Sequence, residues 1–328
     1  LCYVAAFAEA TRIGGASATD TTLKRGRNML RLEGMMPPLV TNYDEDGEVT
    51  TAGLEEQLTF YIEAGCTGFF VGASTGEGVL QTAEERCRYL EAVVKIASGK
   101  ATVIAQVGAA STRKACELAR RAARIGADVV SSVMPFYFVV GPEAAADHYR
   151  AISDAADLPF LLYYLESATR AEFTTQIFTD HFAEIPRLVG MKYSGMDLEI
   201  FGRIAEFYGD RISMLIGPDQ FLLPALTLGA HGSIATSYNY MPEIAVGVYR
   251  HYRAGELEAA QALMRRQFSV IHLLLRKYPM LGATREIMRM RGMETGRPRG
   301  PLPRMTPEQA RQLRVDLEAL DFFSDPIR

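Results

Sequence analysis

From Gly34 onward, short β-rich runs alternate with segments of helical periodicity, and this alternation constrains the fold more than any other feature of the sequence. It is typical of repeated strand–helix units whose strands pair in parallel. The predicted strands are Met35–Thr41, Gly68–Ser74, Thr102–Gly108, Ala127–Met134, Phe160–Leu165, Leu188–Ser194, Ser213–Gly217 and Ser233–Ser237. Eight such units over about 220 residues favour a (β/α)8 TIM barrel, of the α/β class, over a doubly wound sheet. A dinucleotide-binding sheet also needs a glycine-rich turn after its first strand, and that run ends in Thr41-Asn42-Tyr43-Asp44 instead.

Helical segments separate these strands and also follow the last one. Six of those between strands are Thr51–Ala64, Thr82–Ala97, Ser111–Ile125, Pro142–Ala156, Thr174–Phe182 and Asp197–Tyr208. Many begin at Ser, Thr, Asp or Pro and end at Gly, as helix capping favours. Three more helices, predicted to form a C-terminal extension of the barrel, are Leu257–Tyr278, Gly282–Met290 and Pro307–Leu320.

The chain therefore divides into a barrel domain at residues 29–254 and a C-terminal helical region at 255–328. Residues 1–28 are small, polar and rich in Gly and Thr, show no clear period, and precede the first methionine, Met29. We interpret them as an N-terminal extension outside the fold, disordered or not part of the natural start.

One lysine, Lys192, interrupts the apolar strand Leu188–Ser194, whereas the other five lie in the N-terminal extension, in helices or at helix edges. Burial disfavours the ammonium form, so a lysine of ordinary pKa about 10.4 can be brought toward neutrality, and the neutral amine attacks ketones. The alternative is a strand-end lysine whose ammonium reaches solvent. Side chains alternate along a strand, which predicts that Lys192 faces the barrel interior. The predicted inward set is Gly190, Lys192 and Ser194, and the outward set is Val189, Met191 and Tyr193.

Active sites of such barrels lie at the carboxyl ends of the strands, and two further strand exits carry polar side chains. The second strand exits into Gly72–Gly78, where glycines allow a tight turn and the hydroxyls of Ser74 and Thr75 suit a small carboxylate. Turn formation alone also explains such glycines. The fourth strand exits through Met134–Phe138 and brings the phenol of Tyr137 to the same rim. A rim tyrosine often only packs, but beside an inward lysine it can move protons.

Composition points to small-molecule chemistry. The formal net charge is −4, so neither nucleic acid nor an anionic membrane is a predicted partner. No apolar run is long enough to span a membrane. The four cysteines and five histidines are scattered without metal-ligand spacing, which predicts reduced thiols in a cytoplasmic protein and no metal cofactor.

Three separated motifs, each at a strand exit, carry a family resemblance. The turn GASTGEG (72–78), the segment MPFY (134–137) and the strand GMKYSG (190–195) lie about 55 residues apart. In this order they resemble the class I pyruvate-dependent aldolases of the dihydrodipicolinate synthase and N-acetylneuraminate lyase superfamily. The later GPDQ (217–220), SYNYMPE (237–243) and GRPRGPL (296–302) agree with it, so the resemblance extends from about Gly34 to Leu320.

The resemblance implies a covalent mechanism that needs no cofactor. In it, Lys192 is the Schiff-base lysine, Tyr137 the proton-relay tyrosine, and Ser74 with Thr75 the binders of the pyruvoyl carboxylate. It also implies pyruvate and a small 2-keto acid as the molecules bound, and a homotetramer built as a dimer of dimers.

Departures from the family's pattern favour its lyase branch. After Tyr137 the chain has Phe138-Val139-Val140, where synthases usually carry an arginine that binds a second carboxylate. Glu166 stands where the family usually has proline after the fifth strand. It is either a solvated loop carboxylate, paired with Arg170, or a group that contacts substrate hydroxyls or acts as a base.

The opposite rim resembles the part of the lyase branch that binds the distal end of a sugar acid. Its matching residues, which together favour a polyhydroxylated 2-keto acid, are Ser194, Gly217, Asp219, Gln220 and Thr236.

The predicted function is cleavage of a 2-keto-3-deoxy sugar acid or N-acetylneuraminate to pyruvate and an aldehyde. Three alternatives stay open: a dehydratase or deaminase that uses the same imine, a condensation like that of dihydrodipicolinate synthase, and a non-catalytic barrel that senses a keto acid. Intact Lys192, Tyr137, Ser74 and Thr75 argue against the sensor, because a binding protein has no need of a costly inward lysine.

Overall fold

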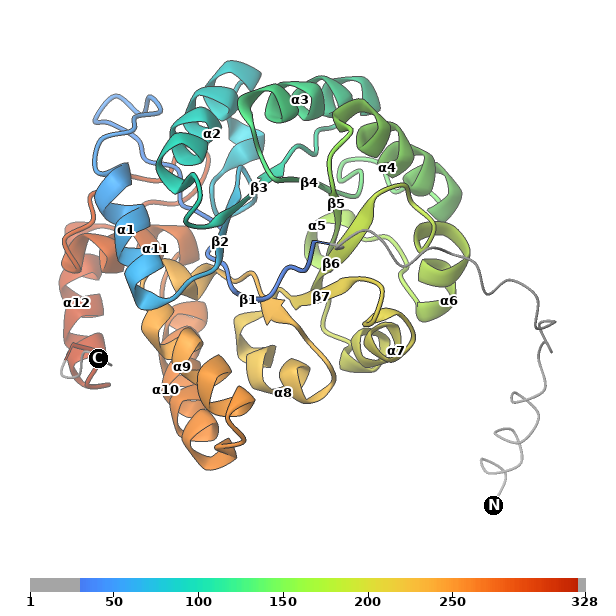
Figure 1. Ribbon diagram of the computed structural model, residues 1–328. Helices are drawn as coiled ribbons and strands as arrows, with labels where there is room; N and C mark the ends of the chain where they lie inside the picture. Colours follow the sequence, from blue (N-terminus) through green and yellow to red (C-terminus); the bar gives the residue numbers. More distant parts are fainter. Residues whose placement is uncertain (1–29, 324–328) are drawn as a thin grey trace.

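The computed structural model describes residues 30–323, and its core is a barrel of eight parallel strands (Figure 1). The strands are β1 (Gly34–Met35), β2 (Gly68–Val71), β3 (Thr102–Gln106), β4 (Val129–Val133), β5 (Phe160–Leu165), β6 (Leu188–Ser194), β7 (Ser213–Ile216) and β8 (Gly232–Ser233). Each overlaps the strand predicted for it, although β1 shares only Met35 and β8 only Ser233 with the prediction. The predicted TIM barrel is confirmed.

The first strand is shorter than the sequence predicts. The ladder runs β1-β8-β7-β6-β5-β4-β3-β2, and β1 (Gly34–Met35) shares only Met35 with the predicted strand Met35–Thr41. Pro37 and Pro38 follow, and proline has no backbone N–H to donate to a neighbouring strand. The gap between β1 and β2 is instead closed by three hydrogen bonds, from Thr67 N to Met35 O (3.0 Å), from Phe70 N to Pro37 O (3.0 Å) and from Leu39 N to Phe70 O (2.9 Å).

Helices form a ring outside the strands, and α10, α11 and α12 lie beyond this ring on the side of α1 and α9 (Figure 1). The helices are α1 (Leu54–Ala64), α2 (Ala83–Ala97), α3 (Thr112–Ile125), α4 (Pro142–Ala156), α5 (Glu166–Thr169), α6 (Thr175–Ile177), α7 (Leu198–Tyr208), α8 (Leu222–Thr227), α9 (Pro242–Arg253), α10 (Leu257–Lys277), α11 (Met280–Met290) and α12 (Pro307–Glu318). The three predicted C-terminal helices are therefore present. The segment predicted as one helix, Thr174–Phe182, is instead the short α6 followed by a π-helical turn, η2 (Phe178–Phe182), in which Ala183 N donates to Phe178 O (2.9 Å).

Side-chain alternation along the strands separates two apolar layers. On β5, Leu161 and Tyr163 belong to the cluster that fills the barrel, whereas Leu162 and Tyr164 pack outward against the helices. Strands of a closed barrel are buried on both faces, which explains why they are apolar almost throughout.

The sixth strand departs from simple alternation at one position. Its pairing with β5 jumps from Phe160↔Leu188 to Leu161↔Gly190, so Val189 is an extra residue in the ladder. Val189 consequently packs against the inner cluster, and its predicted outward orientation is wrong. Met191 and Tyr193 lie in the outer layer as predicted.

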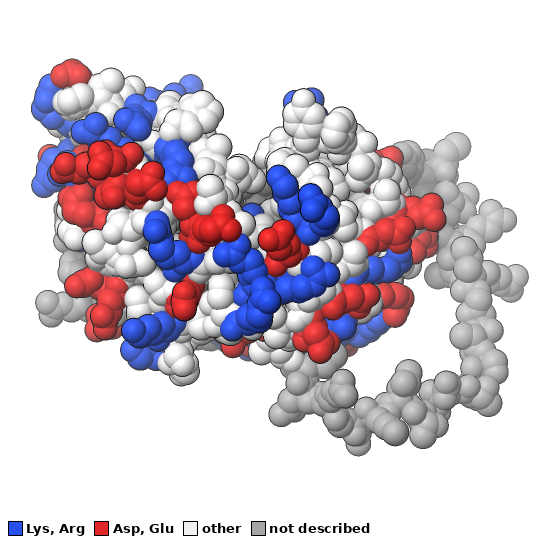
Figure 2. Space-filling model, turned by 90° about the horizontal axis from the view of Figure 1, so that it is seen from above, with Lys and Arg blue, Asp and Glu red and all other residues white. Residues whose placement is uncertain are grey.

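The C-terminal helices share an apolar core with the barrel. Helix α10 packs along α9, and a second buried cluster joins Val40 and Tyr240 of the barrel to Leu274, Ile287 and Leu313 of the helical region. None of the helices between residues 30 and 323 is long and apolar enough to cross a membrane. The predicted extension at residues 1–28 lies outside the described residues. Figure 2 shows a face on which Lys and Arg are interspersed with Asp and Glu rather than gathered into one basic surface.

Candidate active site

The Lys192 side chain lies inside the barrel among aromatic rings. It is 5% exposed, and its Nζ atom is 4.4 Å from the ring centroid of Tyr163 and 4.7 Å from that of Phe70. Tyr163 is the direct neighbour of Lys192 across the β5–β6 ladder. The ammonium therefore does not reach solvent, which excludes the strand-end alternative.

Burial makes Lys192 an amine that is partly neutral near physiological pH. The loss of hydration lowers its pKa from 10.5 to about 7, and the negative charge of Asp219 opposes this decrease. A lysine with such a pKa is a nucleophile toward carbonyl carbon.

A phenol beside the lysine is held by two serine hydroxyls. The Tyr163 side chain hydrogen-bonds with Ser74, from the β2 exit, and with Ser194, from the end of β6. Burial raises the pKa of Tyr163 to about 12, so its hydroxyl carries a proton at neutral pH. Two of the predicted site residues are thus joined to Lys192 through a tyrosine that the sequence analysis did not select.

The sequence did contain a signal for Tyr163. Phe160–Leu165 is the strand that precedes the lysine strand, and alternation places its Tyr163 on the same face as Leu161, toward the interior. A phenol inside the barrel on the neighbouring strand is closer to the lysine than one beyond the end of β4.

The structure leaves Tyr137 at the rim. Its side chain is 80% exposed and contacts Phe138, with ring centroids 5.0 Å apart. The assignment of the relay to Tyr137 therefore stays a prediction, and this arrangement does not bring its hydroxyl to Lys192.

The exits of β2 and β8 meet through two threonines. The Oγ1 atoms of Thr75 and Thr236 are 2.9 Å apart, and Thr75 is buried while Ser74 is exposed. The predicted carboxylate-binding turn therefore contacts one of the predicted distal residues directly.

Asp219 adds a carboxylate to the same end of the barrel. It begins a short 3-10 helix, η3 (Asp219–Phe221), which also contains Gln220, and its Oδ2 atom accepts a hydrogen bond from Ser237 N (3.1 Å). Burial raises its pKa to about 6, although Ser237 and the charge of Lys192 favour the ionised form. Above that pH the carboxylate stabilises a cation at Lys192.

Gly217 is needed for close packing next to Ser194. A Cβ atom at position 217 would lie 1.8 Å from Ser194 Oγ, which is far inside contact distance. Any larger residue there would displace the hydroxyl that binds Tyr163.

Glu166 is exposed at the end of β5. Its Oε2 atom accepts a hydrogen bond from Met196 N (2.8 Å), in the loop after β6. Arg170 contacts the Glu166 carbonyl oxygen through its own amide (3.2 Å). The carboxylate thus ties two strand exits together, and the proposed pairing with Arg170 is not what holds it.

Within residues 30–323, no three His, Cys, Asp or Glu side chains are grouped as a metal site requires. The Lys192 amine is surrounded by phenol, hydroxyl and carboxylate groups, and this set suits acid–base and nucleophilic chemistry.

Comparison with known proteins agrees with this geometry. A sequence profile of the dihydrodipicolinate synthetase family matches residues 31–320. The chain belongs to this family. An uncharacterized DapA-like lyase of Halobacterium salinarum is 34% identical over 293 residues, which are 89% of this chain and 95% of the relative. The N-acetylneuraminate lyase of Rhizobium meliloti is 31% identical over 272 residues, 83% and 90% of the two chains.

A solved structure from the dihydrodipicolinate synthetase family gives the same result. The dihydrodipicolinate synthase of Bacillus anthracis superimposes with a TM-score of 0.84 at 26% identity and covers 89% of this chain and 99% of its own. The resemblance predicted from the motifs is confirmed. The protein is a lyase of the class I pyruvate-dependent aldolase type.

Proposed function

We propose that the protein cleaves a 2-keto-3-deoxy sugar acid or N-acetylneuraminate to pyruvate and an aldehyde through a Schiff base on Lys192. The observation that carries this proposal is the buried amine, with its pKa near 7, next to the serine-bound phenol of Tyr163. No cofactor takes part, because the iminium itself accepts the electrons.

The first stage forms the imine. Neutral Lys192 attacks the C2 carbonyl carbon, and a proton moves from nitrogen to oxygen to give a carbinolamine. Tyr163 then donates its proton to the C2 hydroxyl, which leaves as water, and the products are a protonated imine and a phenolate. The low pKa of Lys192 and the high pKa of Tyr163 favour these starting protonation states.

The second stage breaks the bond between C3 and C4. The Tyr163 phenolate takes the proton of the C4 hydroxyl, the C3–C4 electron pair moves into the iminium, and an aldehyde departs from an enamine. Tyr163 then protonates C3, and water hydrolyses the resulting imine to release pyruvate and Lys192. In this scheme Tyr163, not Tyr137, performs the relay, because it is the phenol in contact with the lysine.

The remaining residues bind the substrate. In this proposal Ser74 and Thr75 bind the carboxylate, and the distal hydroxyls are bound by Ser194, Gly217, Asp219, Gln220 and Thr236. Glu166 is already engaged by Met196 N, which supports a role at the rim over a role as the base of a dehydratase. The homotetramer stays a prediction from the resemblance, and the cytoplasmic compartment stays a prediction from the composition.

Borohydride trapping tests the covalent step. Incubation with pyruvate and borohydride is expected to attach a reduced adduct to Lys192, located by peptide mass spectrometry, because only a near-neutral amine forms the imine efficiently. The exposed Lys95 is the internal control and is expected to remain unmodified. Absence of an adduct at Lys192 would contradict the Schiff-base mechanism.

Product analysis then separates the possible reactions. Pyruvate release from a panel of 2-keto-3-deoxy sugar acids and N-acetylneuraminate is expected for the lyase, whereas a dehydratase yields a dehydrated acid that keeps all its carbons. A panel that gives only dehydrated acids would contradict the proposed cleavage.

The pH dependence follows from the lysine. Its pKa of about 7 predicts that kcat/KM decreases as the pH falls through about 7, because the protonated amine cannot attack. The charge of Asp219 raises that pKa, so Asp219→Asn is expected to move this acid limb to lower pH. The measurement is the pH profile of kcat/KM, which reports the pKa values of the free enzyme. A limb that moves to higher pH, or does not move, contradicts the assignment.

A further inference from the structure

The glutamate of the carboxylate-binding turn is buried away from the substrate side. Glu77 follows Ser74, Thr75 and Gly76, its side chain is 0% exposed, and its backbone has φ 57°. Left-handed backbone is unusual for a residue with a side chain, and it persists only where surrounding contacts enforce it. The contacts that enforce it here come from the C-terminal helical region.

Arg285 of α11 binds this glutamate. Its Nε and Nη2 atoms donate to Glu77 Oε1 at 3.2 and 2.5 Å, and its side chain is 3% exposed. Two more guanidinium hydrogens are also used, since Nη2 donates to Thr41 O (3.0 Å) and Nη1 to Thr295 O. A single arginine therefore connects the β1 exit, the β2 turn and the segment after α11.

The turn that carries Ser74 and Thr75 is hydrogen-bonded both at Glu77 and to the barrel. Glu77 N donates to Ser74 O (3.1 Å), so the backbone of Glu77 closes the turn that carries the two hydroxyls. Gly76 O accepts from Thr41 Oγ1 (2.7 Å). Glu77 and the two hydroxyl residues therefore belong to one short hydrogen-bonded turn.

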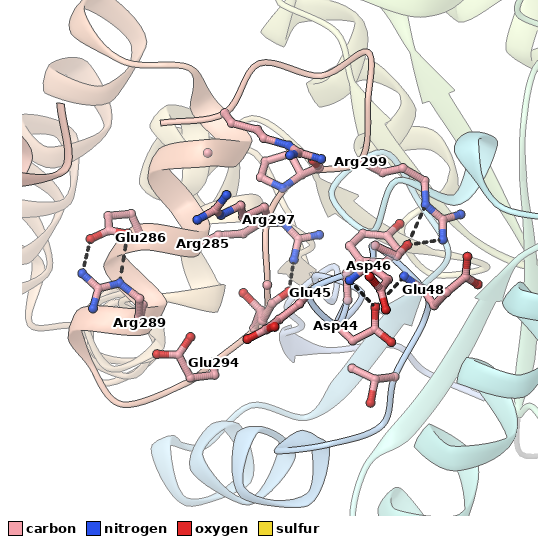
Figure 3. Close-up of a pocket in the computed structure, with 18 of the residues that line it drawn as sticks. Asp44, Glu45, Asp46, Glu48, Arg285, Glu286, Arg289, Glu294, Arg297 and Arg299 are labelled. Atoms are coloured by element: carbon pink, nitrogen blue, oxygen red, sulfur yellow. Dashed lines mark hydrogen bonds and ion pairs between the residues drawn. The ribbon is translucent and has the colours of Figure 1, made fainter. Parts of the chain in front are cut away.

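A second arginine supports the same carboxylate from the side of a cleft. Arg299 N donates to Glu77 Oε2 (2.8 Å), and the Arg299 side chain pairs with Glu85 at 2.6 Å. Arg285 and Arg299 also stand 5.0 and 4.7 Å from the ring centroid of Tyr43. Figure 3 shows Arg299 reaching from the C-terminal segment toward the loop that carries Asp44 and Glu48, across a cleft of about 1570 Å³.

We propose that Arg285 is a positioning residue: through Glu77 it holds the Ser74–Thr75 turn in the shape that binds the keto-acid carboxylate. The C-terminal helical region is then part of the active site's framework, although it supplies no group that touches the substrate. This inference rests on the proposed function, since it concerns the carboxylate of the same substrate.

The test measures pyruvate binding apart from chemistry. For Arg285→Met and Glu77→Gln, the pyruvate concentration that gives half-maximal borohydride trapping is expected to rise about ten-fold or more, the loss expected for one misplaced charge-assisted contact. The maximal extent of trapping at Lys192 is expected to change less. Arg285→Lys is expected to lie between, because one ammonium can reach Glu77 but cannot also bind both carbonyl oxygens.

Arg291 gives a matched control on the same helix. It caps α11 and pairs with Glu243 at 2.5 Å and with Tyr240 O at 2.7 Å, so it also fastens the helical region to the barrel. Arg291→Met is expected to lower the melting temperature as an anchor should, with the pyruvate half-saturation unchanged within about two-fold. Equal increases in the Arg285 and Arg291 variants, or none in any Arg285 or Glu77 variant, would overturn the inference.

Hydrogen exchange keeps the inference separable from the proposed function. Faster amide exchange in the peptide covering residues 72–78 is expected in Arg285→Met and Arg285→Lys but not in Arg291→Met. If the unaltered enzyme traps no pyruvate, the proposed function fails, and exchange alone then decides whether Arg285 shapes the turn. Unchanged exchange in the Arg285 variants counts against it.

Discussion

Lys192→Met is expected to abolish the reaction and to stabilise the fold. Activity should fall by about four orders of magnitude or more, because every other lysine between residues 30 and 323 is exposed and cannot form the imine inside the barrel. Stability should rise because the folded state no longer has to hold a lysine whose pKa is lowered from 10.5 to about 7. Methionine has a similar volume, so the aromatic surroundings of Tyr163 and Phe70 can accommodate it.

The sign of the pH effect on stability is fixed by the direction of the shift. The unfolded chain binds a proton at Lys192 more readily than the folded chain, so the lysine destabilises the fold fully below pH about 7 and progressively less up to pH 10.5. The gain from Lys192→Met is therefore expected to be up to about 5 kcal/mol at pH 6 and about 2 kcal/mol at pH 9.

Urea unfolding at the two pH values measures this gain. Lys95→Met, at an exposed position of α2, is the control and should change neither activity nor stability appreciably. Retained turnover, or a variant less stable at pH 6 than the parent, would show that Lys192 is neither the nucleophile nor a buried cation.

Tyr163→Phe is expected to lower kcat by about 10²- to 10⁴-fold, the usual contribution of a positioned acid–base group. The ring that packs against Lys192 is kept, and only the hydroxyl that Ser74 and Ser194 bind is lost. Steady-state kinetics with the best substrate of the panel gives the measurement. The variant should still form a trapped adduct, more slowly, because Lys192 remains.

Tyr137→Phe is the matched comparison, since it removes the phenol that is 80% exposed at the rim. A loss of less than about ten-fold in kcat is expected for it. A larger loss of kcat in Tyr137→Phe than in Tyr163→Phe would show that Tyr137 performs the proton relay, as the motif alone predicts.

The fold and the inward lysine were predictable from local patterns. Strand–helix alternation needs only short windows of sequence, and a charged residue inside an apolar strand is visible without any tertiary information. Ser74 and Thr75 were selected as candidates for the same reason, because a strand exit rich in glycine and hydroxyls is a local feature.

The missed features depend on contacts between distant segments or on irregular backbone. The contact of Tyr163 with Lys192 and the exposed position of Tyr137 depend on how far the loop after β4 carries its tyrosine outward, and which of the two performs the relay stays a prediction. The inward position of Val189 depends on a bulge, which alternation cannot anticipate. The ion pair of Glu77 with Arg285 joins residues 208 positions apart.

The pairing of the first strand, β1, with the last strand, β8, has a consequence for the order in which the chain folds. The first strand pairs Gly34 with Gly232, so a ribosome must release most of the polypeptide before β1 has a register partner. On its other side β1 is joined to β2 by the few bonds that Pro37 permits, which gives little early stabilisation. Closure is therefore expected late in synthesis, and Arg285 emerges later still. The proposed keto-acid site would then acquire its final shape only after translation has passed the barrel altogether.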